Sequence, residues 1–471
     1  MDPIKPTLNS DQKAAFLAIK KFLGHPHANT FVLKGYAGTG KTFLMQYLGA
    51  WLKEKEYNFC MLAATGRAAS VLRGKTGFST KTVHSELYNF SKVDGIDEGM
   101  FSSTVRELSG QMSLQFKTRG PDEGKKLYIV DEASMLSGDL SADVLFATFG
   151  SGILLNDFFE VVGKNKVIFV GDPCQLPPVG QAVSPALDLD WLNTQNRVAV
   201  SFTLEKIERT DAGNDILKLA GAVRKMGLDN NIERFPKLPA LNLANVKLHT
   251  NDDTMFSDYL NIYKTTGNRG TLAIARSNKM VQHINREMRR ELFGAYDMPL
   301  QQGDVLLVTQ NNYAVPLTNG DFVTISELGE IRTKESLHFQ GVKVKSVSSG
   351  AEYNLLLSLD TLYSKTGNFT NDQMKTLMID FSYRMRDDEI KTNTFKYKQA
   401  MLEDEYLNCL KATFGYGVTC HKAQGGEWNS VYLFLDKSMY GMPRHELYKW
   451  WYTAITRAKK ELNLVRDWWV R

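Results

Sequence analysis

The chain has 471 residues, of which 43% are hydrophobic and 23% charged, and it carries a formal net charge of +5 at pH 7. This is the composition of an ordinary soluble globular protein with room for about three or four domains. No apolar run approaches the length of a membrane span, and the N-terminus has no signal-peptide pattern. The mild basicity permits an anionic partner such as nucleic acid without requiring one. The four cysteines are scattered without a C-x-x-C pair, which excludes a disulfide framework or a zinc site and indicates a reducing, cytoplasmic setting.

The first predicted helix begins near Asn9-Ser-Asp-Gln12 and has an apolar face that includes Ala15, Ile19 and Phe22. Gln12 lies at its start. A side-chain amide at this position either reads the edge of an adenine base or is simply solvated, and the residues alone favour solvation.

Residues 35–42 read G-x-x-x-x-G-K-T and follow a predicted buried strand at 30–34. A helical pattern of apolar residues follows them, so the stretch has the context of a phosphate-binding loop. Its glycines let backbone N–H groups surround phosphate oxygens at the positive end of a helix. Lys41 can reach the outer phosphates, and the Thr42 hydroxyl can ligate Mg²⁺. The predicted nucleotide contacts here are Gly35, Gly38, Thr39, Gly40, Lys41 and Thr42.

A second predicted strand, 59–64, leads into Thr65-Gly-Arg67 at the start of a helix. This pattern is typical of a phosphate-binding strand end, and a capped helix with an exposed arginine explains it equally well. Residues 86–126 differ in composition from the segments before them, with many glycines and serines and several aromatic residues. We therefore predict a small insertion there.

Two further strands end in polar residues. Asp131-Glu132 follow the strand at 126–130, and Gln175 lies in the turn after the strand at 166–170. Asp131 would hold Mg²⁺ through water, Glu132 would polarise the attacking water, and Gln175 would sense the terminal phosphate. Strand ends that lie side by side favour a doubly wound parallel sheet, which binds ligands at the carboxyl ends of its strands.

A second α/β pattern begins with the strand at 271–275 and a basic helix at 280–292. Residues 299–414 are rich in predicted strands separated by Gly and Asn turns, and their later part is polar and helical. We predict that they form an inserted small β-barrel. The α/β pattern then returns, with strands at 431–435 and 461–465.

In this order the motifs resemble the superfamily 1 helicases, specifically their Dda- and RecD-like branch. The resemblance spans nearly the whole chain, from Gln12 to Arg457. Ala64, Gly426 and Trp428 depart from the usual pattern. The matching motifs are the loop at 35–42, Val-Asp131-Glu132, Gly171-Asp-Pro-x-Gln175-Leu-Pro-Pro, His421-Lys-Ala-Gln-Gly-Gly-Glu427 and Tyr452-Thr-Ala-Ile-Thr-Arg457-Ala.

The resemblance implies an α/β fold of two RecA-like P-loop parallel-sheet domains with ATP between them. Domain 1A is expected at 1–197, with a pin, domain 1B, inserted at 86–126. Domain 2A is expected at 198–298 and 415–471, and an inserted SH3-like β-barrel, domain 2B, at 299–414.

The resemblance also implies roles for single residues. Gln12 would read adenine, Glu427 would lie near the ribose, and Arg209 and Arg457 would be the two arginines supplied to the phosphates from the second domain. The implied nucleic-acid contacts are Thr65, Arg67, Thr82, His84, Thr419 and His421.

The implied activity is that of an ATP-dependent DNA helicase of a bacterial or phage-infected cell, translocating 5′→3′ on single-stranded DNA with ATP and Mg²⁺. Expected partners are single-stranded DNA, junctions of single- and double-stranded DNA, and a single-stranded-DNA-binding protein. We expect a monomer with no membrane association. Three alternatives stay open: a translocase that remodels protein–DNA complexes without separating strands, a nucleotide-gated nucleic-acid clamp without turnover, and an RNA substrate.

Overall fold

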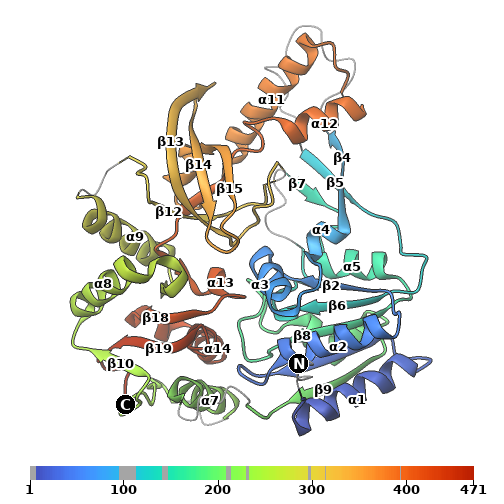
Figure 1. The fold of residues 1–471 in the computed structure, drawn as a ribbon, viewed down its shortest axis with the longest axis vertical. Helices are drawn as coiled ribbons and strands as arrows, with labels where there is room; N and C mark the ends of the chain where they lie inside the picture. Colours follow the sequence, from blue (N-terminus) through green and yellow to red (C-terminus); the bar gives the residue numbers. More distant parts are fainter. Residues whose placement is uncertain are drawn as a thin grey trace, which may run out of the picture.

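The computed structural model describes residues 7–94, 113–140, 147–207, 214–229, 233–294, 299–312, 314–392 and 394–471. These residues form two α/β lobes, a third sheet above the second lobe, and a small inserted sheet above the first (Figure 1). No helix within the described ranges is both long enough and apolar enough to cross a membrane.

The first lobe is a parallel sheet of six strands in the order β3-β2-β6-β8-β1-β9. The inner strands are mostly apolar and buried because helices cover both faces of the sheet. The strands are β1 (Thr30–Gly35), β2 (Phe59–Ala63), β3 (Thr80–Thr82), β6 (Leu127–Asp131), β8 (Lys166–Gly171) and β9 (Ala199–Leu204). The helices of this lobe are α1 (Ser10–Gly24), α2 (Lys41–Glu54), α3 (Gly66–Thr76), α5 (Leu154–Val162) and α6 (Leu189–Thr194), with short 3₁₀ turns at Ala133–Met135 and Pro185–Leu187.

The strand β9 corrects one expected domain boundary. It pairs with β1 in parallel over its whole length, from Thr30 opposite Ala199 to Gly35 opposite Leu204. The first lobe therefore extends to Leu204 rather than ending at residue 197. Most positions of β9 are exposed or half-buried because the strand lies at the edge of the sheet, so it lacks the continuous buried run of the central strands.

The second lobe is a parallel sheet of five strands in the order β10-β19-β18-β11-β17. It joins segments that are far apart in the chain, which Figure 1 shows as green and red elements side by side. The strands are β10 (Val246–His249), β11 (Thr271–Ala275), β17 (Gly417–Thr419), β18 (Trp428–Phe434) and β19 (Ala458–Val465). The helices are α7 (Asp215–Leu228), α8 (Asp252–Gly270), α9 (Asn278–Phe293), α13 (Cys420–Ala423) and α14 (Arg444–Ile455), with a 3₁₀ turn at Lys437–Gly441.

The third sheet is antiparallel, in the order β15-β14-β13-β12-β16. A bridge between Leu357 and Leu410 brings its two edges together, which curls the sheet around its own apolar core. The SH3-like assignment itself stays a prediction. The strands are β12 (Val305–Val308), β13 (Phe322–Lys334), β14 (Leu337–Ser346), β15 (Glu352–Ser358) and β16 (Ala412–Phe414), and the helices between the last two are α10 (Leu359–Leu362), α11 (Asn371–Asp387) and α12 (Phe395–Glu403).

The inserted sheet has three strands, β4 (Tyr88–Asp94), β5 (Ser113–Thr118) and β7 (Ala147–Phe149), and the short helix α4 (Val83–Leu87) leads into it. β4 and β5 are antiparallel, and β7 joins β5 in parallel. β7 lies outside the insertion expected at 86–126, and a strand of three residues leaves no periodic pattern to detect. Part of the expected pin, residues 95–112, falls outside the described residues.

Candidate active site

The loop at 35–42 joins β1 to α2 and has the backbone geometry of a phosphate-binding loop. Gly38 and Gly40 have φ angles of +82° and +78°, in the left-handed region that only glycine adopts without strain. Gly40 is the residue that caps α2, and no side chain occupies the cap. The first N–H groups of α2 are therefore free of a side-chain partner and can donate to an anion.

Gln12 braces this loop from behind. Its side chain is buried, with Nε2 donating to the Thr39 carbonyl at 3.3 Å and Oε1 accepting from the Asn9 N–H at 3.2 Å. The expectation from the residues alone, a solvated amide, is therefore wrong: the residue closes the capping box of α1 and supports the loop. A Cβ on Gly40 would lie 2.4 Å from Gln12 Nε2, so this packing also requires glycine.

Lys41 folds over the loop. Its Nζ donates to the carbonyl oxygens of Gly35 at 2.6 Å and Tyr36 at 3.3 Å, and Thr39 Oγ1 donates to the same Tyr36 carbonyl at 2.8 Å. The Lys41 ammonium group is thus held by neutral backbone carbonyl oxygens, which are weak acceptors, and Lys41 lines a cavity that the two lobes share. Phosphate oxygens are stronger acceptors for an ammonium group than carbonyl oxygens are, so the arrangement fits a phosphate ligand.

Asp131 ends β6 and Glu132 follows it with a φ of +50°. Burial, followed by the neighbouring charge of Glu132, raises the pKa of the Asp131 carboxyl. A divalent cation would reverse that shift by favouring the ionised carboxylate. Together with the Thr42 hydroxyl at the start of α2, Asp131 supplies the oxygen ligands that Mg²⁺ prefers.

Gln175 projects from the turn after β8 into the same cavity. The residue is buried, and its Oε1 has no hydrogen-bond partner among the described residues. A buried amide oxygen requires a hydrogen-bond partner. The position therefore suits a water molecule or a ligand group at the far end of the phosphate site.

The two lobes share one cavity of about 480 Å³. The first lobe contributes the phosphate loop, the carboxylate pair and Gln175, and the second contributes Gly425, Glu427 and Arg457. Lys75 on α3 forms an ion pair with Glu427 at 3.5 Å across the boundary. A cavity of this size accommodates a nucleotide-sized ligand in contact with both lobes.

Arg457 is buried at the end of α14. Its guanidinium donates to the carbonyl oxygens of Thr453 at 3.0 Å and Gly426 at 3.2 Å, and to the Thr456 hydroxyl at 3.1 Å. The structure thus places this arginine in the wall of the cavity, opposite the phosphate loop. Its partner in the implied pair, Arg209, lies outside the described residues.

Hydrogen bonds close the boundary between the lobes, and the sequence motifs did not reveal them. The Tyr452 hydroxyl on α14 accepts from the Ala37 N–H of the phosphate loop at 2.9 Å and donates to Asp172 at 2.7 Å. Burial, followed by the charge of Asp172, raises the pKa of Tyr452, so the hydroxyl keeps its proton. Leu176 donates its N–H to Thr453 at 2.8 Å and accepts from Gln424 at 3.0 Å.

Arg67 is not the exposed arginine of a capped helix. Its guanidinium stacks on Trp428 of the second lobe at 4.1 Å and on Phe322 of the third sheet at 5.0 Å, measured to the ring centroids. Burial lowers its pKa to about 10, so it stays charged at neutral pH. Sequence could not reveal this junction, because the three residues lie far apart in the chain.

The remaining implied nucleic-acid contacts lie near the carboxyl ends of strands in both lobes. Thr65 and Thr82 cap α3 and α4 through their hydroxyls, and Thr419 ends β17. His84 packs its ring against Tyr88 and Phe149 in the inserted sheet. Burial lowers the pKa of both His84 and His421. Their contacts with nucleic acid stay predictions.

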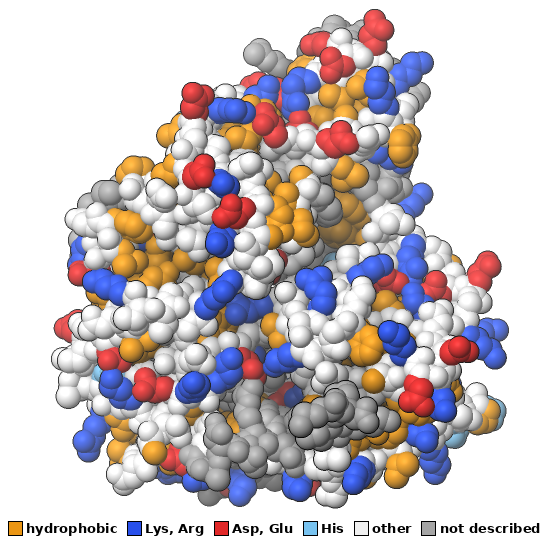
Figure 2. Space-filling model, in the orientation of Figure 1, with side chains coloured by type: hydrophobic (Ala, Val, Ile, Leu, Met, Phe, Trp, Pro, Cys, Tyr) orange, Lys and Arg blue, Asp and Glu red, His pale blue; other side chains and the backbone are white. Residues whose placement is uncertain are grey.

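Figure 2 shows Lys and Arg side chains on both sides of the seam between the lobes. Positive charges of this kind attract polyanions such as nucleic acid. The described residues contain no cluster of three or more His, Cys, Asp and Glu side chains that could hold a metal by themselves.

Two family profiles match separate parts of the chain. The profile of the AAA domain matches residues 7–235, which form the first lobe and the start of the second. The profile of the UvrD-like helicase C-terminal domain matches residues 414–465, the last segment of the second lobe.

Relatives match over most of the chain at low identity. An uncharacterized protein of Acanthamoeba polyphaga mimivirus is 22% identical over 97% of this chain and 99% of its own length. The ATP-dependent RecD2 DNA helicase of Deinococcus radiodurans is 24% identical over 96% of this chain, which spans 48% of that protein. The ATP-dependent DNA helicase Pif1 of Psychrobacter sp. is 21% identical over 86% of this chain, which spans 62% of it.

Among solved structures, that of a Bacteroides Pif1 helicase in complex with ADP-AlF3 and single-stranded DNA aligns with a TM-score of 0.49 at 15% identity. The alignment covers 98% of this chain and 93% of that one.

Proposed function

We propose that this chain is an ATP-dependent DNA helicase of the Pif1/RecD-like branch of superfamily 1, which moves 5′→3′ on single-stranded DNA and unwinds duplexes. The observation that carries the proposal is the shared cavity. The phosphate loop and carboxylate pair of one lobe face Arg457 and Glu427 of the other. A triphosphate bound there draws the two lobes together, and loss of its terminal phosphate releases them.

Each side chain has a part in this chemistry. The N–H groups at the start of α2 and the Lys41 ammonium bind the phosphates, and Glu132 orients and accepts a proton from the attacking water. Gln175, with its buried Oε1, contacts that water or the terminal phosphate. Arg457 stabilises the negative charge that develops on the transferred group. Adenine recognition by Gln12 stays a prediction of the resemblance, and the hydrogen bond from its amide to the Thr39 carbonyl supports the loop.

Thr42 and Asp131 would hold Mg²⁺, which neutralises phosphate charge when it is bound. Asp131 meets the requirement for a carboxylate at the carboxyl end of a central strand, next to the helix start that carries Thr42.

Single-stranded DNA would lie across the carboxyl ends of the strands of both lobes, in contact with Thr65, Thr82, Thr419 and the two histidines. Contacts with phosphates are largely independent of sequence, which suits a motor that must pass every base. The two lobes grip the strand in alternation as the cleft closes and opens. A monomeric state and a contact with a single-stranded-DNA-binding protein stay predictions of the resemblance.

Steady-state ATP hydrolysis, with and without single-stranded DNA, tests the site. Lys41→Ala should abolish the DNA-stimulated rate. Arg457→Ala should retain nucleotide binding and lower kcat by about 10³-fold or more. Substantial turnover in Lys41→Ala would refute the assignment of the phosphate site. Equal losses of binding and turnover in Arg457→Ala would show that this arginine only supports the fold.

A further inference from the structure

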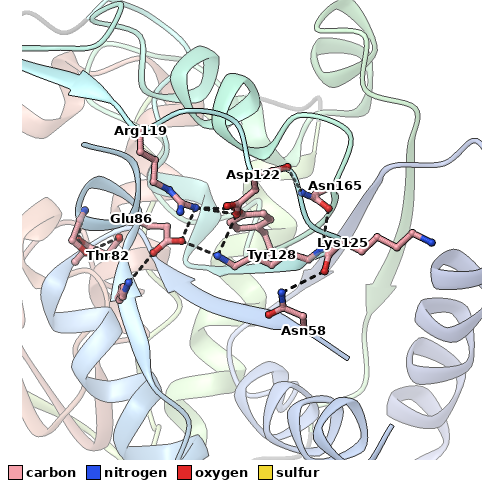
Figure 3. A network of polar contacts seen from close by, with 11 residues as sticks. Asn58, Thr82, Glu86, Arg119, Asp122, Lys125, Tyr128 and Asn165 are labelled. Atoms are coloured by element: carbon pink, nitrogen blue, oxygen red, sulfur yellow. Dashed lines mark hydrogen bonds and ion pairs between the residues drawn. The ribbon is translucent and has the colours of Figure 1, made fainter. Parts of the chain in front are cut away.

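The base of the inserted sheet contains a buried carboxylate that the proposed chemistry does not use. Glu86, in the short helix α4, has only 4% of its side chain exposed. It accepts from Arg119 at 2.7 Å, from Lys126 at 3.0 Å and from Lys81 at 3.0 Å (Figure 3). These cations come from the residues after β5, before β6 and within β3, respectively.

The cations are tied in turn to the sheet of the first lobe. Arg119 also donates to Asp122 at 3.1 Å and to the Tyr128 hydroxyl at 3.0 Å, and Tyr128 bonds to Asp122. Tyr128 lies in β6, the strand that ends in the catalytic carboxylates. Figure 3 shows the acidic and basic groups of this network converging between the insertion and the sheet. We call these residues, Lys81, Glu86, Arg119, Asp122, Lys126 and Tyr128, the Glu86 hub.

The hub lies where both strands of the inserted hairpin leave the first lobe. Glu86 precedes β4 by two residues, and Arg119 directly follows β5. The Arg119 N–H also donates to the Leu87 carbonyl at 2.8 Å, which closes the two ends of the hairpin against each other. The pair Glu86–Arg119 therefore fixes both ends at once.

A second buried carboxylate holds the other side of the base. Asp157 on α5 accepts from the Tyr88 hydroxyl at 2.6 Å and from the Ser151 N–H at 2.9 Å. Tyr88 begins β4, and Ser151 follows β7 by two residues. A Cβ on Gly150 would lie 2.2 Å from Asp157, so the packing leaves no space for a side chain at this position.

We propose that Glu86 and Asp157 are positioning residues that fix the inserted sheet rigidly to the ATP-driven lobe, so that movement of the lobe is transmitted to a DNA duplex held against the insertion. The inference rests on the proposed helicase function and names the part of the chain that couples movement to strand separation. Neither carboxylate lines the nucleotide cavity. Buried carboxylates with several partners suit this role. Their hydrogen bonds and ion pairs have a defined geometry, and breaking them is costly.

The test compares strand separation with ATP hydrolysis in the full chain. Glu86→Gln keeps the side-chain volume and removes the charge that three cations share. We expect the number of base pairs unwound per ATP to fall about tenfold or more, because small displacements of a working group are costly. The DNA-stimulated kcat should stay within about twofold of wild type, because the cavity is untouched. Asp157→Asn should behave in the same way.

Two further measurements distinguish positioning from general stability. Amide hydrogen exchange should quicken in β4 and β5 of Glu86→Gln while β1 and β8 keep their protection. The double variant Glu86→Gln/Arg119→Gln removes the charge of both partners of this ion pair. The number of base pairs unwound per ATP should partly recover in it. The control is Asp258→Asn in the second lobe, whose carboxylate bonds to Lys247 and the Tyr432 hydroxyl, both at 2.7 Å. It should leave coupling unchanged.

Wild-type unwinding per ATP in Glu86→Gln, or equal losses of unwinding and hydrolysis, would overturn the inference. A wild-type protein that hydrolyses ATP without unwinding any DNA would instead refute the proposed helicase function, so the two failures are distinct.

Discussion

Tyr452 connects the lobes through a single hydroxyl, and its removal tests how the cleft closes. Tyr452→Phe keeps the ring but leaves the Ala37 N–H and the buried Asp172 without this partner. We expect the closed cleft to lose about 1–3 kcal/mol. Nucleotide affinity, measured by fluorescence titration, should weaken about tenfold or more.

The control for this variant is Tyr448→Phe on the same helix, which should bind nucleotide normally because Tyr448 packs against α7 rather than the phosphate loop. Tyr452→Phe with the affinity of wild type would show that the hydroxyl does not contribute to closure.

A variant of Arg67 tests whether this residue joins the two lobes or contacts DNA. Its stack on Trp428 and Phe322 predicts that Arg67→Met, which keeps an unbranched side chain of similar reach, lowers the DNA-stimulated kcat of ATP hydrolysis. The dependence of DNA affinity on salt should keep the wild-type slope, because no phosphate contact is lost. A slope that is smaller by about one in a log–log plot would identify Arg67 as a phosphate contact.

Among the larger elements, the inserted sheet should be sensitive to acid. Burial alone would raise the pKa of Glu86, but the hydrogen bonds and charges of Lys126, Lys81 and Arg119 outweigh it, and the pKa lies below its ordinary value. Glu86 therefore stabilises the folded state above the ordinary glutamate pKa, near pH 4.5, and this contribution is lost as pH falls through the lowered value.

Hydrogen exchange of β4 and β5 measured from neutral pH downwards should therefore show protection falling at pH below about 4.5, once corrected for the intrinsic exchange rate. Glu86→Gln should lack this step, because glutamine does not titrate. An identical acid response in both proteins would show that other carboxylates control the stability of this sheet.

The elements with strong local patterns could be predicted from sequence. The strand, loop and helix around Lys41 and the strand before Asp131 have buried apolar runs that end in polar residues, and the structure contains both. The failures are elements whose placement depends on distant partners. β9 is an edge strand with an ambiguous pattern, and β7 is three residues long and is held by the stacking of Phe149 on Phe116 at 4.5 Å.

At the scale of the whole molecule, the sequence allowed the functional side chains to be predicted, but not the residues that each of them contacts. The motif that contains Tyr452 and Arg457 was visible, whereas the bond from Tyr452 to Ala37 joins residues 415 positions apart. The ion pair of Lys75 with Glu427 and the stack of Arg67 on Trp428 likewise cross between lobes. Such contacts depend on how the two lobes pack against each other. The hydrophobic periodicity within either lobe carries no information about that packing.

The most direct measurement of the central claim, that ATP between the lobes drives this chain along one strand of DNA, is displacement of a labelled strand from duplexes with a single-stranded tail at one end. With ATP and Mg²⁺, the wild-type protein should unwind the duplex with a 5′ tail and leave the one with a 3′ tail intact, and Lys41→Ala should unwind neither. Unwinding of only the 3′-tailed duplex, or strand displacement that persists in Lys41→Ala, would contradict the account.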